Sequence, residues 1–486
     1  MNIESYIAHR VSRSLHVNEK RDVRFVRSQI AQPRIATLSV VSLTLLLAAC
    51  GDSPSDIEQM STSLTATLAD TSLVDAPHEG AVINIASGFR SAIRSAVEAH
   101  ESYRAALSLE QEMMSRVDVA QSVRRLQITG NSTVGGMREQ GGTQPDETTT
   151  GVAAGITLSQ LIYDGGESAS NVNRATAEAL GARAERTARG NDIALEAARA
   201  WIDVWQYEAR LTLLRTRTAE MDTVVEQIER MASNGMIDRA ALDSARRQIV
   251  DITLEETRLQ ADLQQAHVRF VRFFNQQPTS LSRPAQIVSL ADAQTQAKTW
   301  QQAPALQRSA AELVIARSAV AGAQSAFKPR ARLQAGVTSP MQDGESTDTS
   351  VGVVLEYTFG DGGRRRAQLL AAEARVEVVE SQLTDAQRTL KAEMDAAVSQ
   401  LAAIDRSMPL VEQQISLSAS EAQTARSQLA TGQSNLRQVI EAKIQNFRAE
   451  DRQISMGAEK LALQLTISSR TGALGQLIGL TSNVSE

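Results

Sequence analysis

The spacing of apolar residues changes period several times along the chain and predicts a series of distinct elements. Residues 87–122 carry apolar side chains at helical spacing and predict one helix. The period then drops to two at residues 126–129 and again at 152–158, which predicts two strands around an exposed loop at 130–151. A helical pattern without proline follows over residues 167–233, and such a helix would extend about 100 Å.

The second half of the chain repeats this order with a shorter loop. Residues 304–327 predict a helix, and residues 330–337 and 351–359 predict strands around a loop at 340–349. The long helical pattern returns from Arg364 to Thr431. It contains Pro409, which we expect to kink or interrupt the helix.

A repeated Asp-Gly-Gly joins strand to helix in both halves, and it shows that the chain contains a duplication. Asp164-Gly165-Gly166 and Asp361-Gly362-Gly363 are 197 positions apart. Before each motif apolar and polar residues alternate with a period of two, and after it they follow helical spacing. The backbone freedom of the glycines is expected to allow this change of direction. Leu126 and Leu333 each follow an Arg and precede a Gln, which predicts that they are strand counterparts and places Ser122 opposite Pro329.

Each long helix is expected to end at a glycine turn, Asn234-Gly235 or Thr431-Gly432, and to be followed by a return helix. Steps of four and three between apolar residues predict coiled-coil packing on both return helices, and ordinary bundle packing is compatible with the same pattern. Glu256 and Asp451 each interrupt one seam. The seam residues are Ala245, Ile249, Ile252, Leu259, Leu263, Ala266, Phe270 and Phe273 in the first copy, and Ile440, Ile444, Phe447, Ile454, Ala458, Leu461 and Leu465 in the second.

The strands have one apolar face and one small or polar face, which is typical of a transmembrane β-barrel. A soluble hairpin packed on a core gives the same pattern. Four strands cannot close a barrel, and an open sheet edge is not tolerated in lipid. If the strands lie in a membrane, several chains must share one barrel, and three chains supply twelve strands.

The N-terminus has the features of a secretory signal. An apolar run at residues 35–49 follows a basic segment and ends in Leu47-Ala48-Ala49-Cys50, and it is too short to span a membrane. Cys50 is the single cysteine of the chain, which excludes an intramolecular disulfide; a plain signal peptide with a chance cysteine is the alternative to a lipidation site. The leader before residue 35 is long, so the translation start could lie after Met1.

Composition narrows the function classes further. Without residues 1–49 the chain has 43 Lys and Arg against 53 Asp and Glu, a net charge near −10, which argues against nucleic acid. Aromatic residues make up only 3% of the chain, which favours long helices packed through small side chains. Residues 51–80 are rich in Ser, Thr and Asp and predict a tether.

The duplicated order of helix, hairpin, Asp-Gly-Gly, long helix, glycine turn and return helix resembles the TolC-like outer-membrane factor family, lipoprotein type. The most specific parts are the segment 159–166 and Thr431-Gly432 followed by Val439-Ile440-Glu441-Ala442. The resemblance implies an α+β membrane protein with a duplicated long-helix coiled-coil barrel and two β-hairpins per chain. Three such chains would form a homotrimeric 12-stranded outer-membrane β-barrel continuing into a periplasmic α-helical tunnel.

The domain boundaries expected on this basis cover the whole chain. They are a signal peptide (1–49), a lipid-anchored linker (50–80), a first repeat (81–275, hairpin about 123–163, tip turn 234–236), an inter-repeat linker (276–302), a second repeat (303–475, hairpin about 329–360, tip turn 431–433) and a C-terminal tail (476–486).

The resemblance also implies functional positions. Leu47-Ala48-Ala49-Cys50 resembles the bacterial lipobox, which implies that Cys50 is acylated, with palmitate among its chains, and holds the protein at outer-membrane lipid. Glu441 lies where family members carry an acid that rings the closed periplasmic entrance, and Gln438 replaces a second such acid; Glu441 as an ordinary solvated residue is the alternative. Ser434 stands where some members have a gate-latching arginine, so that latch is not expected here. The tip residues Asn234, Gly235, Met236, Gly432 and Gln433 are the expected adaptor contacts, although the glycines could serve the turn alone.

Two further readings concern partners and chemistry. The family works with a periplasmic adaptor (membrane fusion) protein and an inner-membrane transporter of ABC or RND type. Tyr163-Asp164-Gly165-Gly166 slightly favours protein cargo through type I secretion, whereas the lipobox is commoner in small-molecule efflux. No cofactor, metal or enzyme activity is expected, because no nucleophile elbow, phosphate loop or His/Cys cluster is present. The rival to an export duct is a lipid-anchored periplasmic coiled-coil adaptor or scaffold without a pore.

Overall fold

The computed structural model describes residues 88–139, 147–233, 239–279, 281–286, 288–339, 347–430 and 436–480, and the isolated positions 66, 83 and 85. The chain divides into two compact units, Met1–Glu79 and Gly80–Glu486, and every element below belongs to the second. Its first copy comprises α4 (Phe89–Ala99), α5 (Glu101–Ser122), β1 (Gln127–Glu139), β2 (Glu147–Tyr163), α6 (Glu167–Ser233) and α7 (Arg239–Phe274). The rest comprises α8 (Leu290–Lys298), η3 (Trp300–Gln302), α9 (Pro304–Ser325), β3 (Arg330–Thr338), β4 (Asp348–Glu356), α10 (Arg364–Ala430), α11 (Leu436–Arg470) and α12 (Ala473–Leu477).

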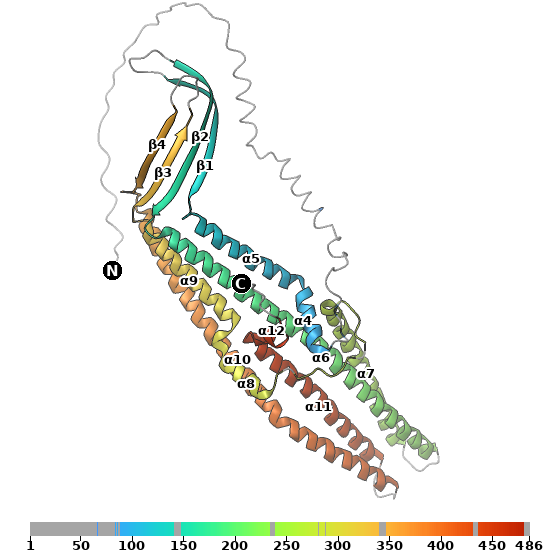
Figure 1. Cartoon of the computed structure of the whole chain (residues 1–486). Coiled ribbons are helices and arrows are strands. Elements are labelled where there is room, and N and C mark those ends of the chain that lie inside the picture. The colour runs from blue at the N-terminus through green and yellow to red at the C-terminus, as the bar shows by residue number, and fades with distance from the viewer. Residues whose placement is uncertain are drawn as a thin grey trace, which may run out of the picture. The chain divides into compact units, whose positions relative to one another are not determined.

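The two long helices carry the architecture, and Figure 1 shows them leading away from the sheet. Both α6 and α10 have 67 residues. Of the expected kink or interruption at Pro409, the interruption does not occur, because α10 continues through Pro409 as one helix. Ile404 and Val411 are buried on either side of Pro409, and this packing holds the helix together where a proline removes one backbone hydrogen bond.

The helix expected at residues 87–122 is two helices, because the chain breaks at His100. This residue has extended backbone angles (φ −74°, ψ 130°), and its Nδ1 accepts a hydrogen bond from the Ser102 amide at 3.2 Å, which caps α5. The two parts bury different amounts of surface: α4 buries a full apolar stripe that includes Phe89 and Ile93, whereas α5 buries only Ala106 and Glu110. A change of direction lets each part follow its own neighbour.

The strands form one antiparallel sheet in the order β1-β2-β3-β4. The loop expected at residues 130–151 is mostly strand, since β1 and β2 remain paired from Gln127↔Ser159 to Glu139↔Glu147. Glycine and threonine obscured the pattern in the sequence, but an antiparallel ladder requires only backbone groups. In contrast, β4 ends at Glu356, before Tyr357 and Phe359, which the alternation had included.

The strand registers correct the expected alignment of the two copies. Ile128 pairs with Leu158, and Ala331 pairs with Leu355. Because Leu158 and Leu355 are counterparts, Ile128 and Ala331 are counterparts as well, 203 positions apart. The same interval separates the last residues of α5 and α9, Ser122 and Ser325. The match of Leu126 with Leu333 and of Ser122 with Pro329 is therefore wrong by four residues. The triplet Arg-Leu-Gln occurs in both copies, but it lies four residues further from the end of the preceding helix in the second copy.

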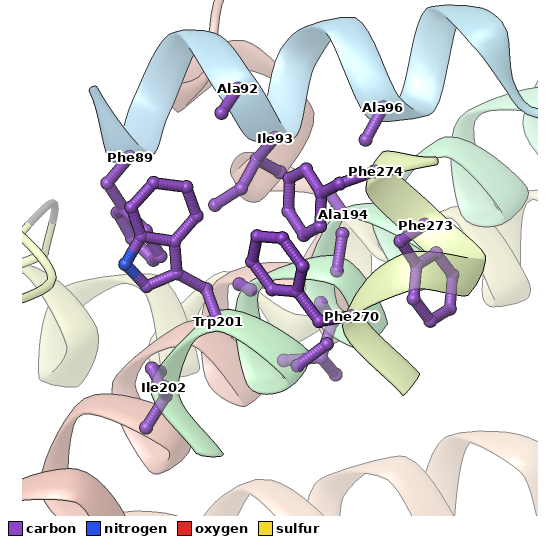
Figure 2. Packing of buried hydrophobic residues seen from close by; sticks show 14 of the residues in the cluster. Phe89, Ala92, Ile93, Ala96, Ala194, Trp201, Ile202, Phe270, Phe273 and Phe274 are labelled. Atoms are coloured by element: carbon purple, nitrogen blue, oxygen red, sulfur yellow. The ribbon is translucent and has the colours of Figure 1, made fainter. Parts of the chain in front are cut away.

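The helices pack in one layer that follows the order of the strands. On one side α6 packs against α5 and α7, on the other against α9 and α11, and these two contact α10. An aromatic cluster joins α4, α6 and α7 (Figure 2), where the Trp201 ring lies 5.6 Å from Phe89 and 5.8 Å from Phe274. Trp201 Nε1 donates to the Ser282 carbonyl at 3.2 Å. Burial of each such ring contributes about 1.5–3 kcal/mol, so this cluster fixes the middle of the layer.

Candidate functional site

The first strand-to-helix joint is closed by the side chain of Asp164. β2 ends at Tyr163 and α6 begins at Glu167. Asp164 Oδ1 accepts from the Gly166 amide at 3.0 Å and Oδ2 from the Ser168 amide at 2.6 Å, so the carboxylate caps α6. Burial acts to raise the pKa of Asp164, but the hydrogen bonds from Ser168 and Gly166 outweigh it and hold the pKa below its ordinary value.

The second joint repeats this arrangement with an additional cation. Asp361 accepts from the Gly363 amide at 3.1 Å and from the Arg365 amide at 3.0 Å. Arg365 Nε also donates to Asp361 Oδ2 at 2.8 Å, and these bonds from Arg365 lower the pKa of Asp361. In the first copy the counterpart of Arg365 is Ser168, whose hydroxyl accepts a hydrogen bond from Arg124 at 3.1 Å. A cation therefore supports each cap, from a different position in each copy.

The glycines of the two joints share a conformation but differ in their surroundings. Gly165 and Gly362 have φ of +68° and +66°, a left-handed conformation that glycine adopts without steric cost. Lys328 packs over Gly165 and its Nζ donates to the Gly165 carbonyl at 3.1 Å. A Cβ at position 165 would lie 2.7 Å from Lys328 Cβ, whereas a Cβ at position 362 would meet no atom within 4 Å.

At the far end of the helices, two coiled coils lie side by side, α6 with α7 and α10 with α11. Three ion pairs connect the first coil to the second through α6 and α11. Arg210 Nε lies 2.7 Å from Asp451, Arg217 Nη2 lies 2.6 Å from Glu450 and Lys443 Nζ lies 3.0 Å from Glu220.

The centre of this network is Arg217. Its guanidinium contacts both carboxylate oxygens of Glu450 and also lies 2.8 Å from Glu220, which Lys443 reaches from the other coil. The hydrogen bond to Glu450 raises the pKa of Arg217. Burial acts to raise the pKa of Glu220, but Lys443 and Arg217 outweigh it, so that this pKa is lowered. Both shifts favour the charged forms of Arg217 and Glu220.

These ion pairs were not found in the sequence, although a signal for them was present. Glu256 and Asp451 had been noted only as interruptions of the apolar seams. In the structure Glu256 pairs with Arg215 at 3.0 Å, between α6 and α7, and Asp451 pairs with Arg210. An acidic residue at a seam position indicated a cation on the facing helix, and only the packing identifies which one.

The expected gate positions lie near the start of α11. Glu441 Oε1 is 2.7 Å from Arg437 Nε, one helical turn earlier, and both side chains are more than half exposed. Gln438 is exposed on the same helix. Each Glu441 is thus accompanied by a cation that the resemblance did not include, which lowers the net charge that a ring of Glu441 would have.

Other expected positions lie outside the described residues. These are the lipidation candidate Cys50 and the tip candidates Asn234, Gly235, Met236, Gly432 and Gln433. Within the described part of the chain, no group of three or more His, Cys, Asp or Glu side chains is placed to hold a metal ion. None of the described helices combines the length and apolar composition that spanning a membrane requires.

A family comparison decides the identity. The sequence matches the outer membrane efflux protein family over residues 92–275 and 296–473. The chain belongs to this family. The resemblance to TolC-like outer-membrane factors is thereby confirmed, and the two matched segments correspond to the two copies.

Solved structures agree with this assignment at the level of the fold. The outer membrane protein VceC of Vibrio cholerae is 16% identical, with a TM-score of 0.66, over 79% of this chain and 96% of that one. The channel protein CusC is 16% identical, with a TM-score of 0.68, over 79% and 91% of the two chains. The CmeC outer membrane channel of Campylobacter jejuni is 12% identical, with a TM-score of 0.67, over 79% and 85%. No curated protein sequence matches the chain.

The family membership selects between the two functions left open by the sequence. Members of the outer membrane efflux protein family are channels of the bacterial outer membrane, and this chain is an export duct of that kind. The scaffold without a pore is not favoured. The described part of the chain is mostly helical with four strands, and it has the helical-tunnel-plus-barrel type of fold.

Proposed function

We propose that three copies of this chain close one 12-stranded barrel in the outer membrane, continuous with a periplasmic helical tunnel that conducts cargo passively. The observation that carries the proposal is the sheet, in which β1 and β4 are both edges. Each edge has a row of unpaired N–H and C=O groups, and each such group costs several kcal/mol in lipid. Neighbouring copies remove both edges.

Exposed apolar side chains at both sides of the layer support the same assembly. Val119 on α5 and Val268 on α7 are 66% and 72% exposed, at one side of the layer. Leu410 and Leu417 on α10 are 65% and 62% exposed, at the other side. Unpaired apolar rows on long helices are typical of surfaces that a partner covers.

The transported material enters at the coiled-coil end. There a periplasmic adaptor protein contacts the tip residues Asn234, Gly235, Met236, Gly432 and Gln433, and an inner-membrane transporter supplies the energy. Glu441 and Gln438 surround the entrance. Cys50 carries the lipid that holds the mature chain at the outer membrane. The Tyr-Asp-Gly-Gly form of the first joint favours protein cargo and an ABC transporter; purification of the tagged protein from its own bacterium would identify the transporter that accompanies it.

The test uses the purified full chain in detergent and in a planar lipid bilayer. The expected results are a trimer that separates into monomers on heating before electrophoresis, and stepwise conductance in the bilayer. A folded monomer that produces no conductance would overturn the proposal. A variant with four charges on the exposed strand face, Ile128→Lys, Val134→Lys, Val353→Lys and Leu355→Lys, is the control, because it should lose membrane insertion.

A further inference from the structure

The contact between the two copies within one chain shows how neighbouring chains meet. Inside the chain the first copy meets the second through β2 against β3, α6 against α9 and α6 against α11. The remaining free elements are β1, α5 and α7 at one side of the layer and α10 and β4 at the other. These are the counterparts of β3, α9, α11, α6 and β2, in that order. A repeated unit that closes a ring reuses its contact, so the internal contact describes the external one.

The internal contact fixes a strand register that can be transferred. Thr157 pairs with Gly336 and Ser159 with Gln334. The counterpart of β2 lies 197 positions later, in β4, and the counterpart of β3 lies 203 positions earlier, in β1. The transferred register pairs Val354 with Thr133 of a second copy, and Glu356 with Asn131 of that copy.

The direction of the side chains agrees with this register. In the chain, Ile128 lies beside Leu158 on the sheet face that carries most of the exposed apolar residues. The transferred register sets Val353 opposite Val134 and Leu355 opposite Ser132, and all four positions belong to that face by strand alternation. A slip of one residue would place apolar side chains of one strand beside residues of the opposite face on the other strand. Among the neighbouring registers, only those shifted by two residues keep the apolar side chains of both strands on the same face.

The joints supply an independent observation. Gly165 is covered by Lys328, which donates to its carbonyl at 3.1 Å, whereas its counterpart Gly362 has open space around it and the same positive φ. The residue 203 positions before Lys328 is Arg125. It is also a cation, it is exposed, and it belongs to the free side of the layer. The open space at Gly362 therefore matches a cation from the next copy.

We infer that β4 pairs with β1 of a second copy in the register Val354↔Thr133, and that Arg125 of that copy packs over Gly362 and donates to its carbonyl. This inference rests on the proposed trimeric duct and specifies how its protomers meet. Three such contacts close the ring. The contact is specific because strand register and the cation must match together.

Cysteine pairs test the register. In a chain carrying both Val354→Cys and Thr133→Cys, mild oxidation should link all three protomers into a covalent trimer, because each chain has one cysteine at each free edge. The pairs Val354→Cys with Asn131→Cys and Val354→Cys with Gly135→Cys lie two residues out of register and should link far less. Efficient linking of an out-of-register pair, with weak linking of the first pair, would overturn the register.

The trimer is measured separately, by light scattering without oxidant. An intact trimer that links in another register refutes this inference and leaves the trimeric duct standing. A monomer under all conditions refutes both. The parent chain with Cys50 alone is the background, and any covalent trimer formed from it is subtracted.

Substitution of Arg125 tests the second contact. Arg125→Ala should lower the temperature at which the trimer separates into monomers by several degrees, and Arg125→Lys should restore it, because Lys328 performs this role inside the chain. Lys298→Ala is the control, since Lys298 is an exposed cation on α8 and belongs to neither joint. Separation of Arg125→Ala at the temperature of the unchanged protein, with the register pair still linking, would refute the contact at Gly362.

Discussion

Gly165 shows how one residue can carry both a backbone and a packing requirement. Its positive φ excludes most side chains, and Lys328 and the Ser325 carbonyl fill the space where a Cβ would lie. The sequence indicated the need for glycine from the change of period at the motif. The close approach of Lys328, 163 positions away, is visible only in the folded structure.

Gly165→Ala is expected to destabilise the chain by about 2 kcal/mol or more, from backbone strain and overpacking together. The measurement is the free energy of unfolding in detergent. In a Lys328→Gly background the same substitution should cost less, because the nearest atom has been removed. An equal cost in both backgrounds would show that Lys328 plays no part.

Glu441 has a partner that changes the expected behaviour of the gate. Arg437 lies 2.7 Å away, and an exposed pair of this kind contributes about 0–1 kcal/mol to stability. In the proposed duct the pair lies at the periplasmic entrance, where charges act directly on permeating ions.

Glu441→Ala should shift the reversal potential in a salt gradient towards anion preference, because three Arg437 side chains remain uncompensated. Arg437→Ala should shift it the opposite way, and the double substitution should lie between them. The readout is the reversal potential in a planar bilayer. Identical potentials for all four proteins would exclude a role of this pair at the entrance.

At the scale of elements, two neighbouring arginines of α6 form ion pairs with different helices. Arg215 pairs with Glu256 on α7, inside one coiled coil, whereas Arg217 pairs with Glu450 on α11, in the other coil. Only the ion pair of Arg217 joins the two coils. Substitution of Arg215 therefore tests stability within one coil, and substitution of Arg217 tests the attachment of one coil to the other.

Arg217→Ala should increase single-channel conductance by loosening the second coil from the first, while Arg215→Ala should leave the conductance near its original value. A double-mutant cycle with Glu450→Gln should give a coupling of about 1 kcal/mol for this partly buried pair. A coupling near zero, or equal conductance changes for the two arginine variants, would contradict attachment through Arg217.

The link through Glu220 should depend on pH. Its pKa in the folded chain lies below the ordinary value of 4.5, so the ionised form is stabilised by folding. This contribution is complete above pH 4.5 and is lost as the pH falls through the lowered pKa. The difference in Tm between the unchanged protein and Glu220→Gln should therefore shrink below pH 4.5. Asp222→Asn, at an exposed position nearby, is the matched control. If the difference in Tm between the unchanged protein and Glu220→Gln stays constant with pH, the link through Glu220 is refuted.

At the scale of the whole molecule, the proposed assembly has two separate attachments to the membrane, the barrel and a lipid on Cys50. The strands alone hold the duct in lipid in the proposed assembly, and Cys50 adds an anchor at the mature N-terminus. Loss of one should leave the other intact.

Cys50→Ser should abolish incorporation of labelled palmitate, while the trimer and its conductance remain. Ser53→Ala is the control and should retain the label. Labelling of Cys50→Ser at the level of the unchanged protein would exclude Cys50 as the lipidation site.

The sequence by itself determined the order of the strands and the long helices, the duplication, the joints and the family. Each of these follows from short-range information: the period of the apolar residues, a glycine pair after a strand, a repeated motif at constant spacing. For the same reason it missed what depends on contacts between distant segments. In the sequence, glycine-rich strands resemble a loop, because pairing through the backbone leaves no apolar pattern. The sequence predicts a kink or an interruption at Pro409, because the packing on both sides of Pro409 is visible only in the fold.

Only the tertiary structure decided the strand register and the partners of the charged seam residues. A register is a relation between two strands, and a four-residue error in matching Leu126 with Leu333 cannot be detected from either strand alone. Likewise, Asp451 was visible as an acidic residue in an apolar seam, but Arg210 lies 241 positions away and becomes its partner only when α6 and α11 pack together. The physical reason is the same in both cases. The energy of strand pairing or of an ion pair depends on two residues that are distant in the sequence, and only the folded structure determines which two residues meet.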